Sequence, residues 1–471
     1  MPLDGNGNNE LPVPGEEVIA GFAASLRGTL IRPGDAEYDT ERAIQNGMID
    51  RRPALVARCC GAADVIAAVN FAREHKLVLS VKAGGHNVAG NAVNDGGLVI
   101  DLSQLRGIHI DPQARIARVQ GGATWADFDR EAQVFGLATP GGVVSTTGVA
   151  GLTLHGGMGH LRSKHGLSLD NLLAVDIVTA DGQLRHASAE EHPDLFWAVR
   201  GAGSNFGVVT SFTFRLHPVG PTVMLCAAMY NLADAPTVLP QWRDFIATAP
   251  DEFSPLAVFW SVPEGFPPEL VGKPIVIIAG VYAGPVEEGE RLVRPLRELA
   301  TPLLDLSGPM PFTAVQSAFD PFFPKGLRQY WKSTYVNTLS DDLILALCTL
   351  AAERPSPRTT MDIWPQLGAV TRVGATETAF GRRPPLMVAF ESTWTDPAED
   401  EANIAWARRA WASMRRFASE GIYLNFPGFG EEKEELVRAA YGPNFARLQA
   451  VKAEYDPTNL FRMNFNIPPS A

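Results

Sequence analysis

The sequence has little cysteine, with four residues in a chain of 471: Cys59, Cys60, Cys226 and Cys348. Their positions match neither a disulfide framework nor a CxxC metal pair, which excludes a disulfide-stapled secreted scaffold and favours a reducing compartment. No apolar run is long enough to span a bilayer, and the polar, acidic start lacks the hydrophobic core of a signal peptide. We therefore expect a cytoplasmic protein with a short unstructured leader over residues 1–17 and no membrane partner.

Positive charge is also scarce. The formal net charge is -12, and no block of lysine and arginine interleaves with aromatic residues, so phosphate backbones would repel the chain. This excludes nucleic acid as a partner. The composition, 46% hydrophobic and 20% charged, is that of an ordinary folded protein. At roughly 150 residues per domain the length indicates two large domains, in a monomer or a homodimer.

The common motifs for metals and nucleotides are missing as well. No P-loop or HExxH motif occurs, and no Cys, Asp or Glu beside His155, His160 and His165 completes a ligand set, so we expect no metal. The stretch "RGAGSNFG" resembles a dinucleotide fingerprint, but its helix comes before it and its strand after it. A Rossmann site needs the opposite order, because the helix N-terminus holds the pyrophosphate. An NAD enzyme is therefore excluded.

The pattern of expected strands, helices and glycine clusters changes near residue 221, which indicates a domain boundary there. Before that point short strand-like runs alternate with helices and glycine clusters, and two hairpins are expected to turn at Asp111-Pro112 and Asp181-Gly182. Between them Thr124 is placed to cap an amphipathic helix that Gly136 ends. After it, longer strands such as "PLMVAFESTW" are separated by charged helices. We expect a sheet there with helices packed on one face.

Two glycine-rich segments about sixty residues apart remain, "VKAGGHNVAG" and "STTGVAGLTLHGGMG". Each can offer bare backbone N–H groups to one extended anionic ligand, so a cofactor with a diphosphate is the natural candidate. The first segment also carries a histidine, His86, directly after two glycines. An imidazole at the tip of a loop built for close backbone approach indicates chemistry, although an isolated loop histidine lies more often at the surface.

These segments resemble the FAD-linked oxidases of the vanillyl-alcohol oxidase / p-cresol methylhydroxylase fold, and within them the berberine-bridge-enzyme-like group. The resemblance runs from about Met48 to the C-terminus and rests on seven motifs in the family's order: "RRPALVARC", "GGHNVAG", "NDGGLVIDL", "TTGVAGLTL", "GLSLDNLL", "DLFWAVRGAGSNFGVVTSF" and "YDPTNLFRMNFNI". It implies an α+β, two-domain fold with a PCMH-type FAD-binding domain over residues 1–220 and 430–471. The substrate domain, 221–429, would be an antiparallel sheet covered by helices, followed by a berberine-bridge-like segment to residue 471.

The resemblance implies a covalent bond between His86 and the flavin 8α-methyl carbon, which suits the attack of a neutral imidazole on an electrophilic carbon. Many relatives add a cysteinyl bond, but Val144 stands at that position, so we expect FAD to be held by a single covalent link. The remaining residues that the resemblance assigns to FAD are Ala83, Gly84, Gly85, Asn87, Val88, Gly90, Thr146, Thr147, Gly148, Gly151, Leu152, Gly157, Gly207, Val208, Val209, Asn464 and Asn466.

The function that the resemblance implies is transfer of hydride from an alcohol or amine carbon of a small molecule to FAD and then to O2, giving hydrogen peroxide. Thr147 falls where relatives vary a small residue that gates oxygen, although a packed threonine is the ordinary alternative. A flavin dehydrogenase with another electron acceptor would share every motif. A flavin-carrying binding protein without turnover is a further alternative. The substrate, whether sugar, alkaloid, polyketide or amine, stays open.

The catalytic base departs from the family's pattern. Plant-type relatives use a tyrosine where "IYLNF" here has Phe426, and a phenyl ring has no proton to exchange. Strand alternation places Met387, Ala389 and Glu391 on one face, so Glu391 is the best replacement, with Tyr423 and Asn425 as weaker candidates. A carboxylate partly desolvated there could serve as a base. The alternative is that Glu391 points to solvent or pairs with an arginine.

Overall fold

The computed structural model describes residues 14–381, 383–419, 421–426, 428, 430 and 434–470. The expected leader lies mostly outside this range, and it is shorter than expected because Glu16 and Glu17 already belong to the first helix, α1 (Glu16–Ser25). None of the helices in these ranges is both long and apolar enough to cross a membrane.

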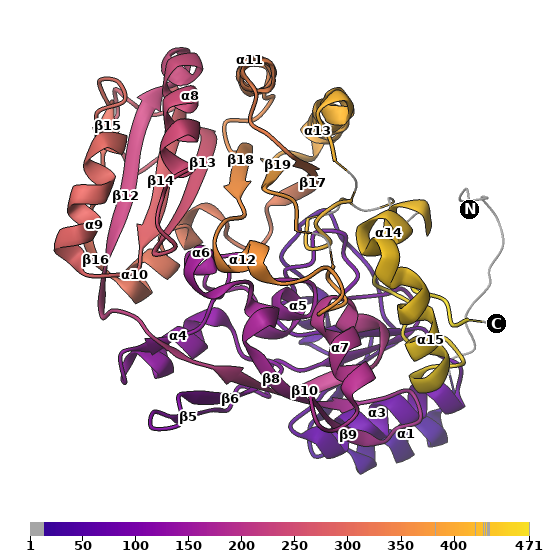
Figure 1. The fold of residues 1–471 in the computed structure, drawn as a ribbon. Helices are drawn as coiled ribbons and strands as arrows, with labels where there is room; N and C mark the ends of the chain where they lie inside the picture. Colours follow the sequence, from indigo (N-terminus) through magenta and orange to yellow (C-terminus); the bar gives the residue numbers. More distant parts are fainter. Residues whose placement is uncertain are drawn as a thin grey trace.

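The first sheet has four short strands, and its central strands are buried runs of aliphatic residues. They lie in the order β1 (Thr29–Ile31), β2 (Leu55–Arg58), β4 (Leu98–Asp101) and β3 (Leu79–Lys82). β4 runs parallel to both β2 and β3, as aliphatic strands covered on both faces commonly do. Helices α1 and α3 (Ala62–Glu74) pack on this sheet at the bottom of Figure 1.

The second sheet is antiparallel throughout. Its five strands lie in the order β5 (Ile108–Asp111), β6 (Ile116–Gln120), β10 (Val208–Arg215), β8 (Leu172–Val178) and β9 (Leu184–Ser188). β5 pairs with β6 and β8 with β9, so both expected hairpins are confirmed. A small sheet joins β7 (Leu137–Ala138) to β11 (His217–Pro218).

The helix after β6 begins and ends where the sequence indicates. In α4 (Trp125–Gln133) the Thr124 side chain accepts a hydrogen bond from the backbone N–H of Asp127, and the Asp127 carboxylate accepts one from the Thr124 N–H. This reciprocal cap satisfies two N–H groups that a helix start leaves without partners. Gly136 has a φ of +64°, a conformation that favours glycine and reverses the chain after the helix.

The third sheet lies after residue 221 and is antiparallel. Its strands are β15 (Leu304–Asp305), β12 (Thr222–Asn231), β14 (Pro274–Tyr282), β13 (Phe253–Ser261), β18 (Thr360–Pro365), β19 (Leu386–Trp394) and β17 (Arg328–Val336), with β16 (Gly308–Pro311) paired to β12. Four helices pack against one face of it: α8 (Ala235–Ile246), α9 (Val286–Val293), α11 (Asp341–Ala352) and α13 (Asp400–Ser413). Figure 1 shows them along its outer side, which confirms a sheet with helices on one face.

The two faces of this sheet lead to different neighbours. Along β19, Val388 and Phe390 join the core beneath the helices, while Met387 and Ala389 join a second cluster that faces the glycine-rich half of the chain. Successive side chains of a strand point to opposite faces, so Glu391 belongs to the second set. The alternation expected for Met387, Ala389 and Glu391 is therefore confirmed.

The C-terminal segment returns to the second sheet. Helices α14 (Glu434–Tyr441) and α15 (Phe445–Tyr455) contribute apolar side chains to the core beneath that sheet, next to α7 (Pro193–Ala202). This return supports the division at about residues 220 and 430, which we retain as a proposal. The remaining α-helices are short: α2 (Tyr38–Arg42), α5 (Val149–Leu154), α6 (Arg162–His165), α10 (Phe312–Gln316) and α12 (Ala369–Arg372).

Candidate active site

A cavity of about 250 Å³ lies between the glycine-rich segments and the inner face of the third sheet. The glycine wall is made by residues 83–87, by ten residues between 142 and 155 and by residues 207–209, and Phe461, Met463 and Asn464 close one end. The sheet wall is made by side chains of β13, β17, β18 and β19 together with residues 423–426. Segments far apart in the sequence thus meet around one space.

The two glycine-rich segments touch through bare backbone. A Cβ at Gly84 would lie 2.3 Å from the backbone nitrogen of Gly148, and a Cβ at Gly148 would lie 2.6 Å from the nitrogen of Gly84. Neither residue can carry a side chain without moving the other segment. Gly85 next to them has a φ of +69°, which favours glycine and turns the loop towards the cavity.

His86 lines the cavity directly after this contact. Its Nε2 lies 3.1 Å from the hydroxyl of Thr146, and its Nδ1 lies 3.4 Å from the hydroxyl of Thr147. Burial lowers the pKa of the imidazole to about 4, and the charge of Asp320 opposes this shift only in part. The ring is therefore neutral at pH 7, the state in which a ring nitrogen keeps a lone pair for attack on carbon.

Most residues assigned to FAD line the cavity. Those that do so are Ala83, Gly84, Gly85, His86, Asn87, Thr147, Gly148, Gly151, Leu152, Gly207, Val208, Val209 and Asn464. Val144 also lines it, and no cysteine of the described residues does.

Five assigned residues lie outside the lining. Thr146 meets the His86 ring from behind. The carbonyl of Val88 accepts a hydrogen bond from Asn46, and that of Gly90 accepts one from Arg51. Gly157, with a φ of +91°, packs on Ser168 and donates its N–H to the hydroxyl of Tyr423. These four support the walls of the cavity.

Asn466 is the fifth. Its side-chain oxygen Oδ1 is buried and has no hydrogen-bond partner within the described chain. Its neighbour Asn464 lines the cavity, where its amide oxygen lies 3.4 Å from Nδ2 of Asn91. Of these two C-terminal amides, Asn464 is therefore the one that a ligand in the cavity can reach.

These features fit FAD. Residues 83–87 line the cavity with glycine-rich backbone that can meet a diphosphate, and the amide of Asn464 lies on the same cavity and can hydrogen-bond a polar group of the cofactor. His86 faces the same space as a neutral imidazole. The residues present can therefore hold the cofactor that the glycine-rich segments predict.

On the opposite wall Glu391 faces the cavity and is only 5% exposed. The alternatives, a solvent-facing or arginine-paired side chain, are therefore wrong. Its neighbour is Asp362, which is also buried and lines the cavity. Burial and the nearby Asp362 raise the pKa of Glu391 well above its usual range, and burial raises the pKa of Asp362 to about 7. Both shifts favour retention of a proton by the pair near neutral pH.

Sequence reasoning missed Asp362. The available signal was an aspartate inside the apolar strand "TMDIWP", on the same strand face as Thr360 and Trp364. Its position opposite Ala389, two residues from Glu391, depends on the pairing of β18 with β19, which the sequence does not give.

Tyr423 and Asn425 also line the cavity, but their polar groups are used within the protein. The Tyr423 hydroxyl accepts hydrogen bonds from the N–H groups of Gly157 and Met158 and from the amide of Asn425. The Asn425 amide also donates to the carbonyls of Leu152 and His155. Burial raises the pKa of Tyr423, which disfavours a role as base. Both residues tie the segment 421–426 to the glycine wall.

Aromatic rings occupy the rest of the sheet wall. The rings that line the cavity there belong to Trp260, Phe319, Phe323, Trp331, Trp364 and Phe426. Phe426, which stands at the family's tyrosine position, meets Trp331 edge-on with ring centroids 5.3 Å apart. No lysine or arginine of the described residues lines the cavity. The sheet wall is thus apolar except for its carboxyl pair and a few neutral polar groups.

The three clustered histidines are not brought together as ligands. His155 lines the cavity and lies 2.9 Å from the Ser204 hydroxyl, while the ring of His165 stacks on His217 with centroids 3.8 Å apart. His160 is buried by itself, and burial lowers its pKa to about 3. Within the described ranges no group of three or more His, Cys, Asp or Glu could hold a metal ion.

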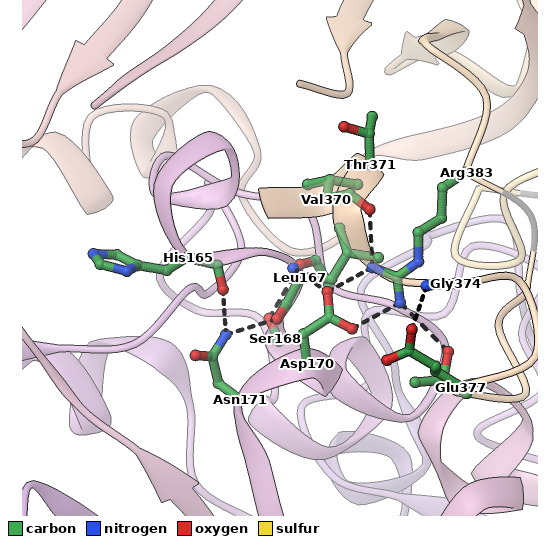
Figure 2. A network of polar contacts seen from close by, with 12 residues as sticks. His165, Leu167, Ser168, Asp170, Asn171, Val370, Thr371, Gly374, Glu377 and Arg383 are labelled. Carbon is green, nitrogen blue, oxygen red and sulfur yellow. Dashed lines mark hydrogen bonds and ion pairs between the residues drawn. The ribbon is translucent and has the colours of Figure 1, made fainter. Parts of the chain in front are cut away.

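An ion pair joins the segment before β19 to the turn between α6 and β8. The guanidinium of Arg383, just before β19, donates two hydrogen bonds of 2.6 and 2.7 Å to the carboxylate of Asp170. Asp170 also accepts from the Leu167 N–H, while the Asn171 amide donates to the carbonyls of His165 and Leu167. Figure 2 shows this network holding the turn between α6 and β8.

Known proteins match the chain along nearly its whole length. Residues 53–188 match a family described as an FAD binding domain, and residues 422–468 match one described as berberine and berberine like. The (R)-6-hydroxynicotine oxidase of Paenarthrobacter nicotinovorans is 33% identical over 94% of this chain and 97% of its own. A xylooligosaccharide oxidase of Thermothelomyces thermophilus is 28% identical over 90% of this chain and 89% of its own.

Solved structures agree with these matches. The crystal structure of 6-hydroxy-D-nicotine oxidase from Arthrobacter nicotinovorans superposes with a TM-score of 0.85 at 32% identity, over 95% of this chain and 99% of that one. A chitooligosaccharide oxidase, at 23% identity and a TM-score of 0.84 over 97% of this chain and all of that one, shares the fold. The chain therefore belongs to the berberine-bridge-enzyme-like FAD-linked oxidoreductases and is an enzyme with their PCMH-type, two-domain α+β fold.

Proposed function

We propose that this enzyme is an oxidase that removes hydride from an alcohol or amine carbon of a small molecule and releases hydrogen peroxide. The observation that carries the proposal is the arrangement of the cavity, with a neutral His86 on one wall and a buried carboxyl pair on the other. FAD, when bound, supplies the hydride acceptor and returns the electrons to dioxygen.

On the glycine wall, His86 would hold the flavin by a single covalent bond. Its low pKa keeps the imidazole unprotonated, and the Thr146 and Thr147 hydroxyls lie close to its two nitrogens. The bond to carbon would replace one of these two contacts, and the other would fix the ring. Val144 leaves no thiol for a second bond. The glycines and Asn464 hold the rest of the cofactor.

On the sheet wall, Glu391 serves as the base that takes the proton from the substrate's oxygen or nitrogen. Glu391 shares a proton with Asp362, whose pKa is raised to about 7, so the pair offers a carboxylate that accepts a proton near neutral pH. Tyr423 and Asn425 position the segment beside it. The aromatic rings exclude water around the reacting carbon.

A flavin dehydrogenase is the second candidate, because it would use every group named above. The two differ in whether O2 reaches the cofactor past Thr147, which lines the cavity. Anaerobic bleaching of the purified protein by a panel of amines, sugars and phenolic alcohols, followed by mixing with air, tests the proposal. Reoxidation faster than that of free flavin is expected, and it should slow in Thr147→Leu but not in Thr147→Ser. Reoxidation of the wild type no faster than free flavin would favour the dehydrogenase.

A protein that binds flavin without turnover is the third candidate. It would show no bleaching with any compound of the panel, whereas the oxidase and the dehydrogenase both bleach with at least one.

A further inference from the structure

The carboxyl pair is built by the register of two neighbouring strands. Asp362 lies opposite Ala389, and Thr360 lies opposite Glu391, so Asp362 and Glu391 are diagonal neighbours on the face that lines the cavity. Diagonal neighbours on an antiparallel sheet are about 7–8 Å apart at the backbone, within reach of side chains of this length. Asp362 is 7% exposed and Glu391 is 5% exposed.

The pair is short of positive charge. No lysine or arginine of the described residues lines the cavity, and none contributes to the pKa shift of either carboxyl group. The Oδ1 atom of Asp362 is buried without a hydrogen-bond partner among the described residues. A buried carboxylate without a cation is unfavourable, so the pair retains a proton and one negative charge that a bound cation would neutralise.

The surroundings of the pair suit an organic cation rather than a hydrated metal ion. Trp260, Trp331 and Trp364 line the same wall, and Phe323 and Phe426 lie beside them. Aromatic faces attract ammonium groups by their quadrupole and cover apolar substituents at the same time. Mg²⁺ and Ca²⁺ instead need several oxygen ligands, and this wall offers few.

We propose that Asp362 and Glu391 together form a recognition site for the ammonium group of an amine substrate with an apolar body, and that the pair takes one proton from it. This inference rests on the proposed function, because it names the substrate class for the same cavity. An uncharged sugar or alcohol would leave the negative charge of the pair without a partner.

The proton step balances within the site. The substrate's N–H bond breaks, its electron pair stays on nitrogen, and an O–H bond forms on the carboxyl pair. The pair passes from one proton and a charge of −1 to two protons and no charge, while the ammonium becomes a neutral amine. That amine has the free lone pair that loss of hydride from the adjacent carbon requires.

The histidine and tyrosine side chains that face the cavity have pKa values outside the pH range in which the carboxyl pair titrates. On the glycine wall, burial lowers the pKa values of His86 and His155 to about 4. Burial raises the pKa of Tyr423, beside the cavity, and that of Tyr335, on the same face of β17. The charged group near His86 is the carboxylate of Asp320, which accepts a hydrogen bond from the Ser145 N–H.

Between about pH 5 and pH 9 the pair is thus the group of this wall that titrates. Below the pKa of Asp362, about 7, a second proton binds the pair and removes its charge. The affinity for a permanent cation should therefore reach its maximum above pH 7. Below pH 7 it should fall by up to tenfold for each pH unit.

The test measures binding to the purified holoenzyme by calorimetry, with benzyltrimethylammonium and phenethyltrimethylammonium as cations that cannot be deprotonated or oxidised in the same way as an amine. Benzyl alcohol and phenethyl alcohol serve as the neutral partners. At pH 8 we expect at least one cation to bind tenfold or more tightly than its alcohol. At pH 6 the preference should shrink about tenfold, with release of close to one proton per bound cation.

Substitutions test whether the preference for cations depends on Asp362 and Glu391. The double variant Asp362→Asn/Glu391→Gln should lose the preference for cations at pH 8 while its affinity for the alcohols stays within about twofold. The control Glu269→Gln makes a charge change at an exposed position outside the cavity and should leave both unchanged. Circular dichroism and the thermal midpoint check folding of each variant. If the double variant does not fold, the pH dependence and the proton release of the wild type decide.

Equal affinity for cations and alcohols at pH 8, or a preference that survives in the double variant, would overturn the inference. Bleaching of the flavin by sugars without any preference for cations would overturn it and leave the proposed oxidase intact. A preference for cations located on the pair, in a protein that no amine bleaches, would support the recognition site and contradict the proposed function.

Discussion

The two walls of the cavity are built in different ways. The glycine wall uses backbone, because Gly84 and Gly148 touch and no side chain fits between their segments. The sheet wall uses side chains, with Asp362 and Glu391 set among aromatic rings. Backbone groups suit a cofactor that is the same across a family, whereas side chains on rigid strands can change from one member to another. On this difference rests our proposal that one wall holds the cofactor and the other selects the substrate.

The largest expected effect on the glycine wall comes from replacing His86. His86→Ala should remove the covalent bond altogether, because no cysteine of the described residues lines the cavity to replace it. Some FAD should stay bound without the bond, since the glycine wall is unchanged. Acid precipitation followed by absorbance of the supernatant measures free and bound flavin. A variant that still retains yellow colour in the pellet would contradict the role of His86.

The ion pair between Arg383 and Asp170, away from both walls, carries the largest expected effect on stability. Arg383 and Asp170 have side chains only 3% and 9% exposed, so Arg383→Met leaves a nearly buried carboxylate unpaired. Loss of one partner of a buried pair costs about 3–5 kcal/mol. Urea unfolding followed by fluorescence measures this loss in the free energy of unfolding.

The matched control for that experiment is Arg438→Met, which removes an exposed pair with Glu434 on α14. Exposed pairs contribute about 0–1 kcal/mol. Equal losses in the two variants would show that the buried pair of Arg383 and Asp170 contributes no more to stability than an exposed one.

On the sheet wall, Glu391→Gln should slow reduction of the flavin about 100-fold, the low end for a positioned base and about 2.7 kcal/mol of barrier. The covalent flavin should stay intact, because Glu391 lies on the other wall. Anaerobic rapid mixing with substrate measures the rate. An unchanged rate would remove Glu391 from the mechanism and would favour a neutral amine whose oxidation needs no protein base.

On the glycine wall, Gly84→Ala should cost about 1–3 kcal/mol through overpacking, because its Cβ meets the backbone of Gly148 rather than a flexible side chain. Gly308→Ala is the control, since no atom lies within 4 Å of a Cβ there. Thermal unfolding of both variants compares them. A Gly84→Ala protein as stable as the control would show that the two segments need not touch.

The sequence predicts features that depend on neighbours along the chain. The cap of α4 at Thr124, the two hairpins and the face of Glu391 follow from local spacing, and the structure confirms them. Val144 and Phe426, the two positions at which the sequence departs from the family's pattern, both line the cavity.

Features that depend on strand pairing could not be predicted. Asp362 is 29 residues before Glu391 and reaches it through the register of β18 with β19. The contact of Arg383 with Asp170 joins segments 213 residues apart. Nothing local distinguishes such residues from an ordinary polar residue in a strand or a turn, so only the fold identifies them.

The most direct test of the account is the mass of the peptide that contains His86, taken from the purified wild-type protein after proteolysis under acid conditions. The account predicts that this peptide carries one FAD bound to a nitrogen of His86 and that no other peptide carries flavin. An unmodified His86 peptide together with free FAD in solution, or flavin on a different residue, would contradict it.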